Sequence, residues 1–228
     1  FSTAHDLPNS VTVHTGDGFG SCRAILLGLL DVYSHSPDAL RASLCSLSFL
    51  SGIEHPLLPL NLQTPSAELI DHALSSPSTS PLAALRTAAA QYVGLNAYLP
   101  YFSSHQTWED VTIREDWPVL IAVPDENDEL AHLEHTSLEH FLQDLLDPSS
   151  LPTTLSLSAM AQAARVNLDV KFPSPEQALM YKGESGGHTT TDNVLHILVY
   201  PSAPTLLIHV VDGQFCIILT PKQNSTTV

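Results

Sequence analysis

Residues 16–25, GDGFGSCRAI, are the most informative segment of this chain. Before it, the alternation of residues over 11–14 predicts a short strand that ends at a glycine-dense loop, residues 15–21. After it, apolar residues recur at helical spacing as far as Val32. The order of elements is therefore strand, glycine-rich loop, cysteine and helix, with Cys22 in the first turn of the helix.

Cys22 thus stands where a helix begins directly after a loop. The exposed N–H groups and the positive end of the helix dipole stabilise a thiolate at such a position. The N–H groups of the loop can also converge on an oxyanion, and the candidate loop residues are Asp17, Gly18, Gly20 and Ser21. Two interpretations remain open from the residues alone: an activated nucleophile, or a turn followed by the first buried residue of a helix.

The chain has three cysteines, Cys22, Cys45 and Cys216. An odd number without Cys-x-x-Cys spacing argues against a disulfide framework and against a structural zinc site. Cys45 and Cys216 lie in apolar helix and strand patterns, so we expect both in the core. A reducing compartment fits this usage, and we expect a cytoplasmic location.

Composition and charge exclude several classes of function. The chain has 228 residues and is 43% hydrophobic, which suits one domain over residues 1–228. Its 8 Lys and Arg against 24 Asp and Glu give a net charge of −16, which repels nucleic acid and favours a basic protein partner. The longest apolar stretches, 24–30 and 194–200, are shorter than the roughly 20 residues of a membrane span, so none is expected. Because the chain begins with Phe1, we expect it to be a piece of something longer.

The sequence predicts a helical lobe around residues 37–100 in the first half of the chain. Ser36-Pro37 is a strong helix start, and Gly52 is a matching stop. Similar Pro signals predict a short helix near 66–74 and a longer, alanine-rich helix near 82–99.

The second half ends mainly in strands. We expect a buried strand at 117–123, an acidic helix at 125–147, a small-residue helix at 156–166 and a strand at 167–172. Three strands close the chain at 194–200, 205–211 and 214–220, and Asp212-Gly213 is a hairpin signal between the last two. Helices first and strands last indicate an α+β fold with a mainly antiparallel C-terminal sheet.

One cluster within the acidic helix looks like a metal site. It comprises His132, Glu134, His135, Glu139 and His140. Some of these residues are three or four apart, as on one face of a helix. A solvated acidic face is the favoured interpretation, because no further ligand pattern accompanies them. We therefore expect neither a metal nor a cofactor.

Residues 16–25 resemble the nucleophile motif of the ovarian tumour (OTU) family, Asp-Gly-Asn-Cys followed by a helix. Here two additional residues separate the Asp-Gly pair from Cys22, and Arg23 directly follows the cysteine. A Ser-Cys-Arg start of this kind is similar to divergent viral members, the tymovirus-type polyprotein proteases. The later elements resemble the family in order, in particular 156–172, 193–200 and 207–212.

The resemblance implies an OTU-like, papain-type fold and a cysteine protease that cleaves isopeptide or peptide bonds after a Gly-Gly-like tail. It assigns Cys22 as nucleophile and His209 as general base, with His196 and His188 as competing bases. Val211 occupies the position of the usual orienting acid or amide, so Asp212 is the candidate orienter. Asp17 and Asn193 are the alternatives for that role.

The implied activity is deubiquitination, and the implied partners are ubiquitin or a ubiquitin-like protein, or the polyprotein to which the chain belongs. Ubiquitin has a basic rim around its apolar patch, which suits the net charge of −16. The rival hypothesis is a non-catalytic OTU-like domain that binds ubiquitin or a neighbouring polyprotein segment. Residues 183–187 would form a mobile glycine-rich loop near the cleft.

Overall fold

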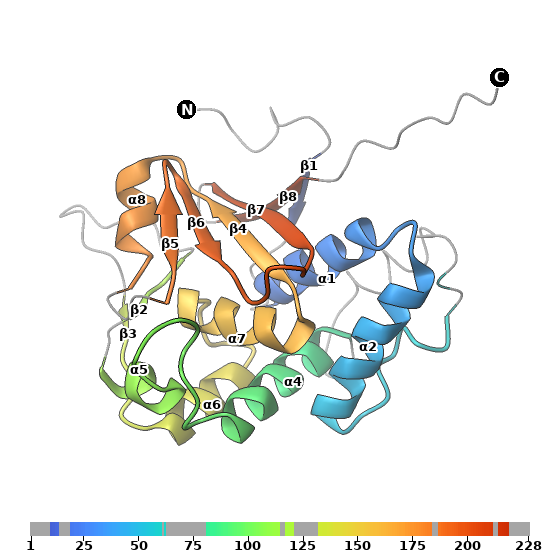
Figure 1. The fold of residues 1–228 in the computed structure, drawn as a ribbon, viewed down its shortest axis with the longest axis horizontal. Coiled ribbons are helices and arrows are strands. Elements are labelled where there is room, and N and C mark those ends of the chain that lie inside the picture. Colours follow the sequence, from blue (N-terminus) through green and yellow to red (C-terminus); the bar gives the residue numbers. More distant parts are fainter. Residues whose placement is uncertain are drawn as a thin grey trace.

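In the computed structural model a six-stranded sheet lies over a layer of helices (Figure 1). The structure describes residues 10–13, 19–60, 62, 81–114, 117–120, 132–183, 187–211 and 214–218. Strands and helices are segregated rather than alternating, so the α+β class expected from the sequence is confirmed.

The sheet is built mainly from the C-terminal third of the chain. Its strands are β1 (Ser10–Val13), β4 (Asn167–Lys171), β5 (Thr189–Thr191), β6 (Val194–Ile197), β7 (Thr205–Val211) and β8 (Gln214–Ile218). Their order is β1-β8-β7-β4-β6-β5. Every neighbouring pair is antiparallel except β4 and β7, which run parallel. The predicted mainly antiparallel sheet is therefore confirmed, as are its three closing strands.

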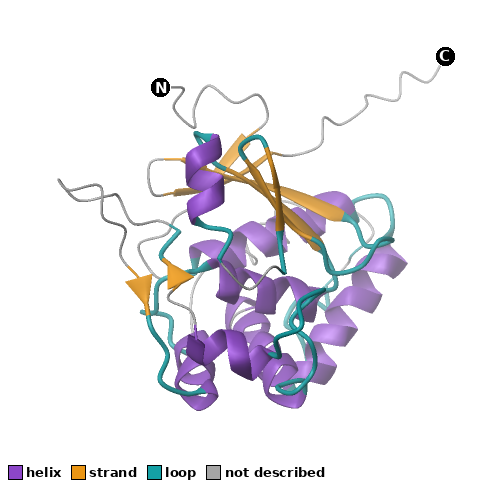
Figure 2. Ribbon diagram, turned by 60° about the vertical axis from the view of Figure 1, so that its left-hand side comes forward, coloured by secondary structure: helices purple, strands orange, loops and turns teal. Residues whose placement is uncertain are grey.

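The helices lie on one side of this sheet, apart from a short one beside its far edge (Figures 1 and 2). They are α1 (Gly20–Val32), α2 (Pro37–Ser51), α4 (Pro81–Leu95), α5 (Trp108–Arg114), α6 (Leu138–Leu146), α7 (Thr154–Ala164) and α8 (Pro175–Met180). Helix α1 packs against β7 and β8, and α4 contacts α2, α6 and α7. Helix α8, the short one, contacts β5 and β6.

The two faces of β7 can be told apart by what they contact. Leu206, Ile208 and Val210 are buried, and the Leu206 side chain lies against Gly28 of α1. Because successive side chains of a strand point to opposite faces, these three residues define the inner face of the sheet, toward α1. Leu207 and His209 therefore lie on the opposite, outer face.

Local signals place several helix ends where the sequence predicts them. Helix α2 begins after Ser36 and ends at Gly52, whose φ of 69° is the left-handed conformation that glycine adopts without strain. At α7, Thr153 and Ser156 form a capping box in which each side chain accepts from the other residue's backbone N–H. Such ends depend on a few adjacent residues, which explains why they are predictable.

The predicted acidic helix over 125–147 is wrong. Helix α6 begins only at Leu138, after Ser137, whose side chain accepts from the His140 N–H. Residues His132–Leu133 instead form β3, which pairs with β2 (Trp117–Pro118). The helix cap and the strand pairing together exclude a continuous helix.

Some predicted elements fall on residues outside the described ones, and other elements were missed. The short helix near 66–74 and the end of the 117–123 strand lie outside the described residues. Helices α5 and α8 and strand β5 were not predicted. Helix α8 follows Ser174-Pro175, the same start signal as that of α2, so the sequence did contain a cue for it.

Candidate functional site

Cys22 lies in the first turn of α1, as predicted, but its thiol is fully buried. Its Sγ atom lies 3.5 Å from the Sδ atom of Met160 on α7. Burial raises the pKa of the Cys22 thiol, and Arg86, Ser21 and Arg23 act in the opposite direction, Arg86 most strongly. In this arrangement Cys22 is a core residue with cationic neighbours.

The predicted oxyanion loop is shorter than expected. Helix α1 begins at Gly20, so Gly20 and Ser21 belong to the helix rather than to a loop, and both are buried. Asp17 and Gly18 lie outside the described residues. The first N–H groups of α1 have no partner within the helix, so this end retains partial positive charge.

Among the described residues, no hydrogen bond joins His209 to Cys22. His209 lies on β7, and Cys216 of β8 and Lys171 of β4 are its neighbours across the sheet. Since α1 packs on the inner face, the outer-face imidazole points away from the helix that carries Cys22. Within the described part of the chain, the His209 Nε2 atom is buried without a hydrogen-bond partner. Burial, and to a lesser extent Lys171, lowers the pKa of the imidazole. Asp212 lies outside the described residues.

The competing bases are engaged elsewhere. The Nε2 atom of His188 interacts with the Tyr101 hydroxyl and lies 3.0 Å from Ser158 Oγ. Burial lowers the pKa of His188 to about 3, so this imidazole is neutral in the fold. His196 Nδ1 lies 2.7 Å from Asp169 Oδ1 on the outer face of the sheet. Asn193, an alternative orienter, instead donates to the Phe172 carbonyl.

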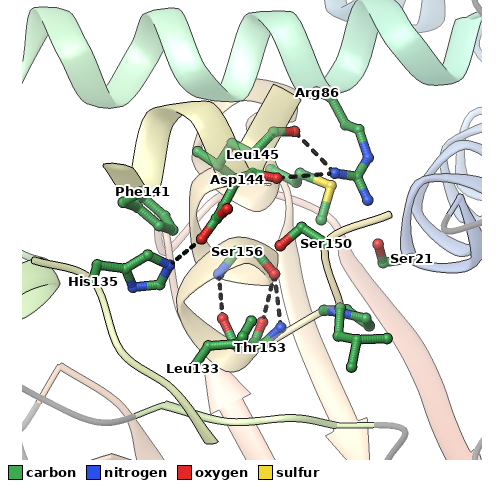
Figure 3. A pocket seen from close by; sticks show the side chains of 13 residues that line it. Ser21, Arg86, Leu133, His135, Phe141, Asp144, Leu145, Ser150, Thr153 and Ser156 are labelled. Carbon is green, nitrogen blue, oxygen red and sulfur yellow. Dashed lines mark hydrogen bonds and ion pairs between the residues drawn. The ribbon is translucent and has the colours of Figure 1, made fainter. Parts of the chain in front are cut away.

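A pocket adjoins Cys22 and contains residues that sequence analysis missed (Figure 3). Arg86 of α4 lines it and is 5% exposed. Its Nη1 atom donates to the carbonyl oxygens of Leu145, at 3.0 Å, and Asp147, at 2.8 Å. These carbonyls lie at the C-terminal end of α6, where a cation is favoured. Arg86 thereby anchors α6 while its positive charge stands close to Cys22.

His135 contributes an imidazole to the same pocket. Its Nε2 atom lies 3.0 Å from Asp144 Oδ2 of α6. Burial lowers the pKa of His135, and Asp144 acts in the opposite direction. The solvated-face interpretation is wrong for His135, which is only 5% exposed. This residue precedes α6, and its ring contacts Phe141 and Asp144 of that helix. The solvated-face interpretation holds for His132, Glu134 and Glu139, which are exposed.

The other two cysteines differ from each other. Cys216 is buried, as predicted, but Cys45 is exposed, so the core assignment of Cys45 is wrong. The buried positions of α2 include Leu44 and Leu47. One residue is about 100° of helix rotation, which turns Cys45 out of that stripe.

Two further features concern only the described part of the chain. Within it, no group of three or more His, Cys, Asp or Glu side chains is placed to hold a metal ion. No helix there is long and apolar enough to cross a membrane.

Comparisons with known proteins give matches among solved structures alone. No family model matches the sequence, and no curated protein matches it either. The complex of h/ceOTUB1 with ubiquitin aldehyde and UBC13~Ub is 14% identical, with a TM-score of 0.49 over 89% of this chain and 73% of that chain. The corresponding UBCH5B~Ub complex is 15% identical, with a TM-score of 0.46 over 89% and 73%. A ceOTUB1 complex with ubiquitin aldehyde and UBC13~Ub is 13% identical, with a TM-score of 0.44 over 89% and 76%.

Proposed function

We propose that this chain is an OTU-like domain that binds ubiquitin or a ubiquitin-like protein without cleaving it. The observation that carries the non-catalytic part is the state of Cys22. Its sulfur is fully buried against Met160, and among the described residues no histidine forms a hydrogen bond with it. A cysteine hydrolase needs a thiolate that the substrate can reach and a base within hydrogen-bond distance of it.

Two physical barriers oppose catalysis in this arrangement. Burial raises the pKa of the Cys22 thiol, which disfavours the thiolate that would attack a carbonyl. In addition, His209 faces away from α1, and turning it inward requires a one-residue shift of β7. Such a shift would move Leu206, Ile208 and Val210 from the inner to the outer face.

The choice of partner rests on the sequence resemblance and on charge. Residues 16–25 resemble the OTU nucleophile motif, and members of that family act on ubiquitin. The net charge of −16 attracts a protein with a basic rim and accelerates its association. Ubiquitin has such a rim around its apolar patch.

A second candidate is a thiol hydrolase for peptide or isopeptide bonds, with Cys22 as nucleophile, His209 as base and Asp212 as orienter. The observation that favours it is the place of Cys22 in the first turn of α1 with Arg86 beside it, since both lower the cost of a thiolate. This function requires the contact between Cys22 and Met160 to open. The oxyanion would be bound by N–H groups of the candidate loop residues Asp17, Gly18, Gly20 and Ser21. Its substrates would be ubiquitin conjugates or the chain's own polyprotein in the cytoplasm, as in the tymovirus-type proteases.

Ubiquitin bearing a C-terminal electrophile separates the two candidates. We expect saturable binding of ubiquitin to wild type and to Cys22→Ala with equal affinity, and no covalent adduct in either. The matched control is Cys216→Ala, which removes another buried thiol. An adduct that forms with wild type and with Cys216→Ala but not with Cys22→Ala would establish the hydrolase instead. Absence of both binding and adduct would refute both candidates.

A further inference from the structure

The C-terminal end of α4 and the turn that follows it carry three large apolar side chains that are exposed. Leu95 is 72% exposed, Tyr98 79% and Leu99 55%. Leu95 is the last residue of α4, and the Leu99 N–H donates to the Asn96 carbonyl, so the three residues lie in one short turn of the chain. Single exposed apolar residues are common, whereas a group of them is typical of an interaction surface.

This exposed surface continues onto α6. The Cδ1 atom of Leu142 lies 3.6 Å from the position that a Cβ atom on Gly94 would occupy, and Gly94 directly precedes Leu95. Helices α4 and α6 lie on the side of the helical layer away from the sheet (Figure 1). We refer to Leu95, Tyr98, Leu99 and the partly buried Leu142 as the α4–α6 patch.

Acidic residues border the α4–α6 patch on two sides. Glu109 of α5 donates its backbone N–H to the Ala97 carbonyl, which brings the first turn of α5 beside Tyr98. Glu139 of α6 is exposed and precedes Leu142 by three residues, a spacing that makes the two neighbours on the helix surface. The patch therefore has a carboxylate on its α5 side and another on its α6 side.

The basic residues of the same helices are engaged elsewhere. The sequences of α4, α5 and α6 contain two, Arg86 and Arg114. Arg86 is 5% exposed and donates to carbonyl oxygens at the end of α6, while Arg114 pairs with Asp110. An apolar patch with an acidic border complements a protein surface of the opposite pattern, an apolar patch surrounded by Lys and Arg.

We propose that the α4–α6 patch is the surface on which this chain binds ubiquitin or a ubiquitin-like protein, with Tyr98 at the centre and Glu109 and Glu139 facing the basic rim of the partner. This inference rests on the proposed function and adds the place of contact. Aromatic residues at the centre of an interface contribute much of the binding energy, whereas charges at its rim mainly accelerate association. Binding at this surface does not require access to the buried Cys22.

Calorimetric titration with ubiquitin tests the apolar part of the patch. We expect Tyr98→Ser to raise Kd at least about tenfold and Leu95→Ser to raise it about three- to tenfold. The matched control is Leu179→Ser, because Leu179 is 60% exposed on α8, which packs against β5 and β6; it should leave Kd unchanged. All three side chains are exposed, so the variants should fold, and their urea midpoints check this.

A second pair of variants tests the acidic border. Glu139→Gln and Glu176→Gln each remove one carboxylate from the first turn of a helix, α6 or α8, so they change the net charge equally. By stopped-flow at low salt, Glu139→Gln should slow association with ubiquitin about two- to fivefold and Glu176→Gln clearly less. The difference should vanish at about 1 M salt, where charges are screened beyond about 3 Å.

The possible results separate this inference from the function on which it rests. If wild type binds ubiquitin and neither Tyr98→Ser nor Leu95→Ser weakens binding, the α4–α6 patch is not the contact surface, while the binding function stands. The same holds if Leu179→Ser weakens binding as much as they do. Absence of ubiquitin binding to wild type would overturn both.

Discussion

Leu206 of β7 occupies the space into which a Cβ atom on Gly28 of α1 would project, with its Cδ1 atom 2.9 Å from that position. The Cβ atom of Leu206 itself lies 3.3 Å from the same position, so rotating the side chain does not relieve the crowding. The absence of a side chain at Gly28 thus allows α1 to pack closely against β7. The close approach also identifies the face of β7 that looks toward α1.

Gly28→Ala should therefore destabilise the protein. Overpacking a core costs about 1–3 kcal/mol, whereas alanine in place of glycine within a helix gains about 1 kcal/mol. We expect a net loss of up to about 2 kcal/mol in the free energy of unfolding, measured by urea denaturation. The matched control is Gly94→Ala in α4, where the added atom meets Leu142 at an ordinary 3.6 Å. That variant should gain about 0.5–1 kcal/mol, and equal effects of the two substitutions would contradict the packing described.

The three cysteines should differ in their reaction with iodoacetamide. Cys45 is exposed, while Cys22 and Cys216 are buried. We expect native protein to be modified at Cys45 at least about tenfold faster than at the other two, because alkylation needs an accessible thiolate. Peptide mass mapping over time measures this. In denaturing urea all three should react alike, whereas fast native labelling of Cys22 would show that its contact with Met160 opens readily.

Acid should destabilise the fold through two buried histidines. Burial lowers the pKa of His188 to about 3 and that of His55 to about 4. In the unfolded chain both titrate near pH 6.5, so above that pH both are neutral in either state. Below pH 6.5 both histidines bind a proton in the unfolded chain but not in the folded protein. Each therefore lowers the free energy of unfolding by up to about 1.4 kcal/mol per pH unit. The loss through His55 ends near its folded pKa of about 4, and that through His188 near about 3.

Urea denaturation at a series of pH values between 7 and 4 measures this loss. In His188→Gln, the free energy of unfolding should fall less steeply with decreasing pH, because the contribution of one of the two histidines is removed. The control is His35→Gln, an exposed residue, which should leave the slope unchanged. A free energy of unfolding that does not fall between pH 6 and 5 would contradict the burial of both imidazoles.

Replacing Arg86 should loosen the end of α6. Its Nη1 atom donates to carbonyl oxygens there, which Arg86→Met would leave without a partner. We expect a loss of about 2–4 kcal/mol in the free energy of unfolding, and partial recovery in Arg86→Lys. The control is Arg114→Met, because Arg114 is 62% exposed in its pair with Asp110 and should change stability by less than about 1 kcal/mol. Equal losses would show that Arg86 acts as a surface charge.

Elements that depend on a few adjacent residues could be predicted from the amino-acid sequence. Helix α2 begins and ends as predicted because Ser36-Pro37 and Gly52 act through their own backbone conformations. Strands β7 and β8 were predicted because alternation and a two-residue turn signal are properties of adjacent residues. The place of Cys22 in the first turn of α1 belongs to the same class.

The direction in which the chemically important side chains point could not be predicted from the sequence, because it depends on tertiary contacts. Both faces of β7 carry apolar residues, for example Leu206 and Leu207, so alternation shows that the faces differ but not which one meets α1. The contact of Leu206 with Gly28 settles this, and with it the outward direction of His209. His135 is buried, and its Nε2 atom contacts Asp144 of α6. The spacing of residues in the sequence does not predict this contact. Facing and burial depend on residues distant in sequence that meet only after folding, so the candidate site was predicted as a set of residues but not as an arrangement.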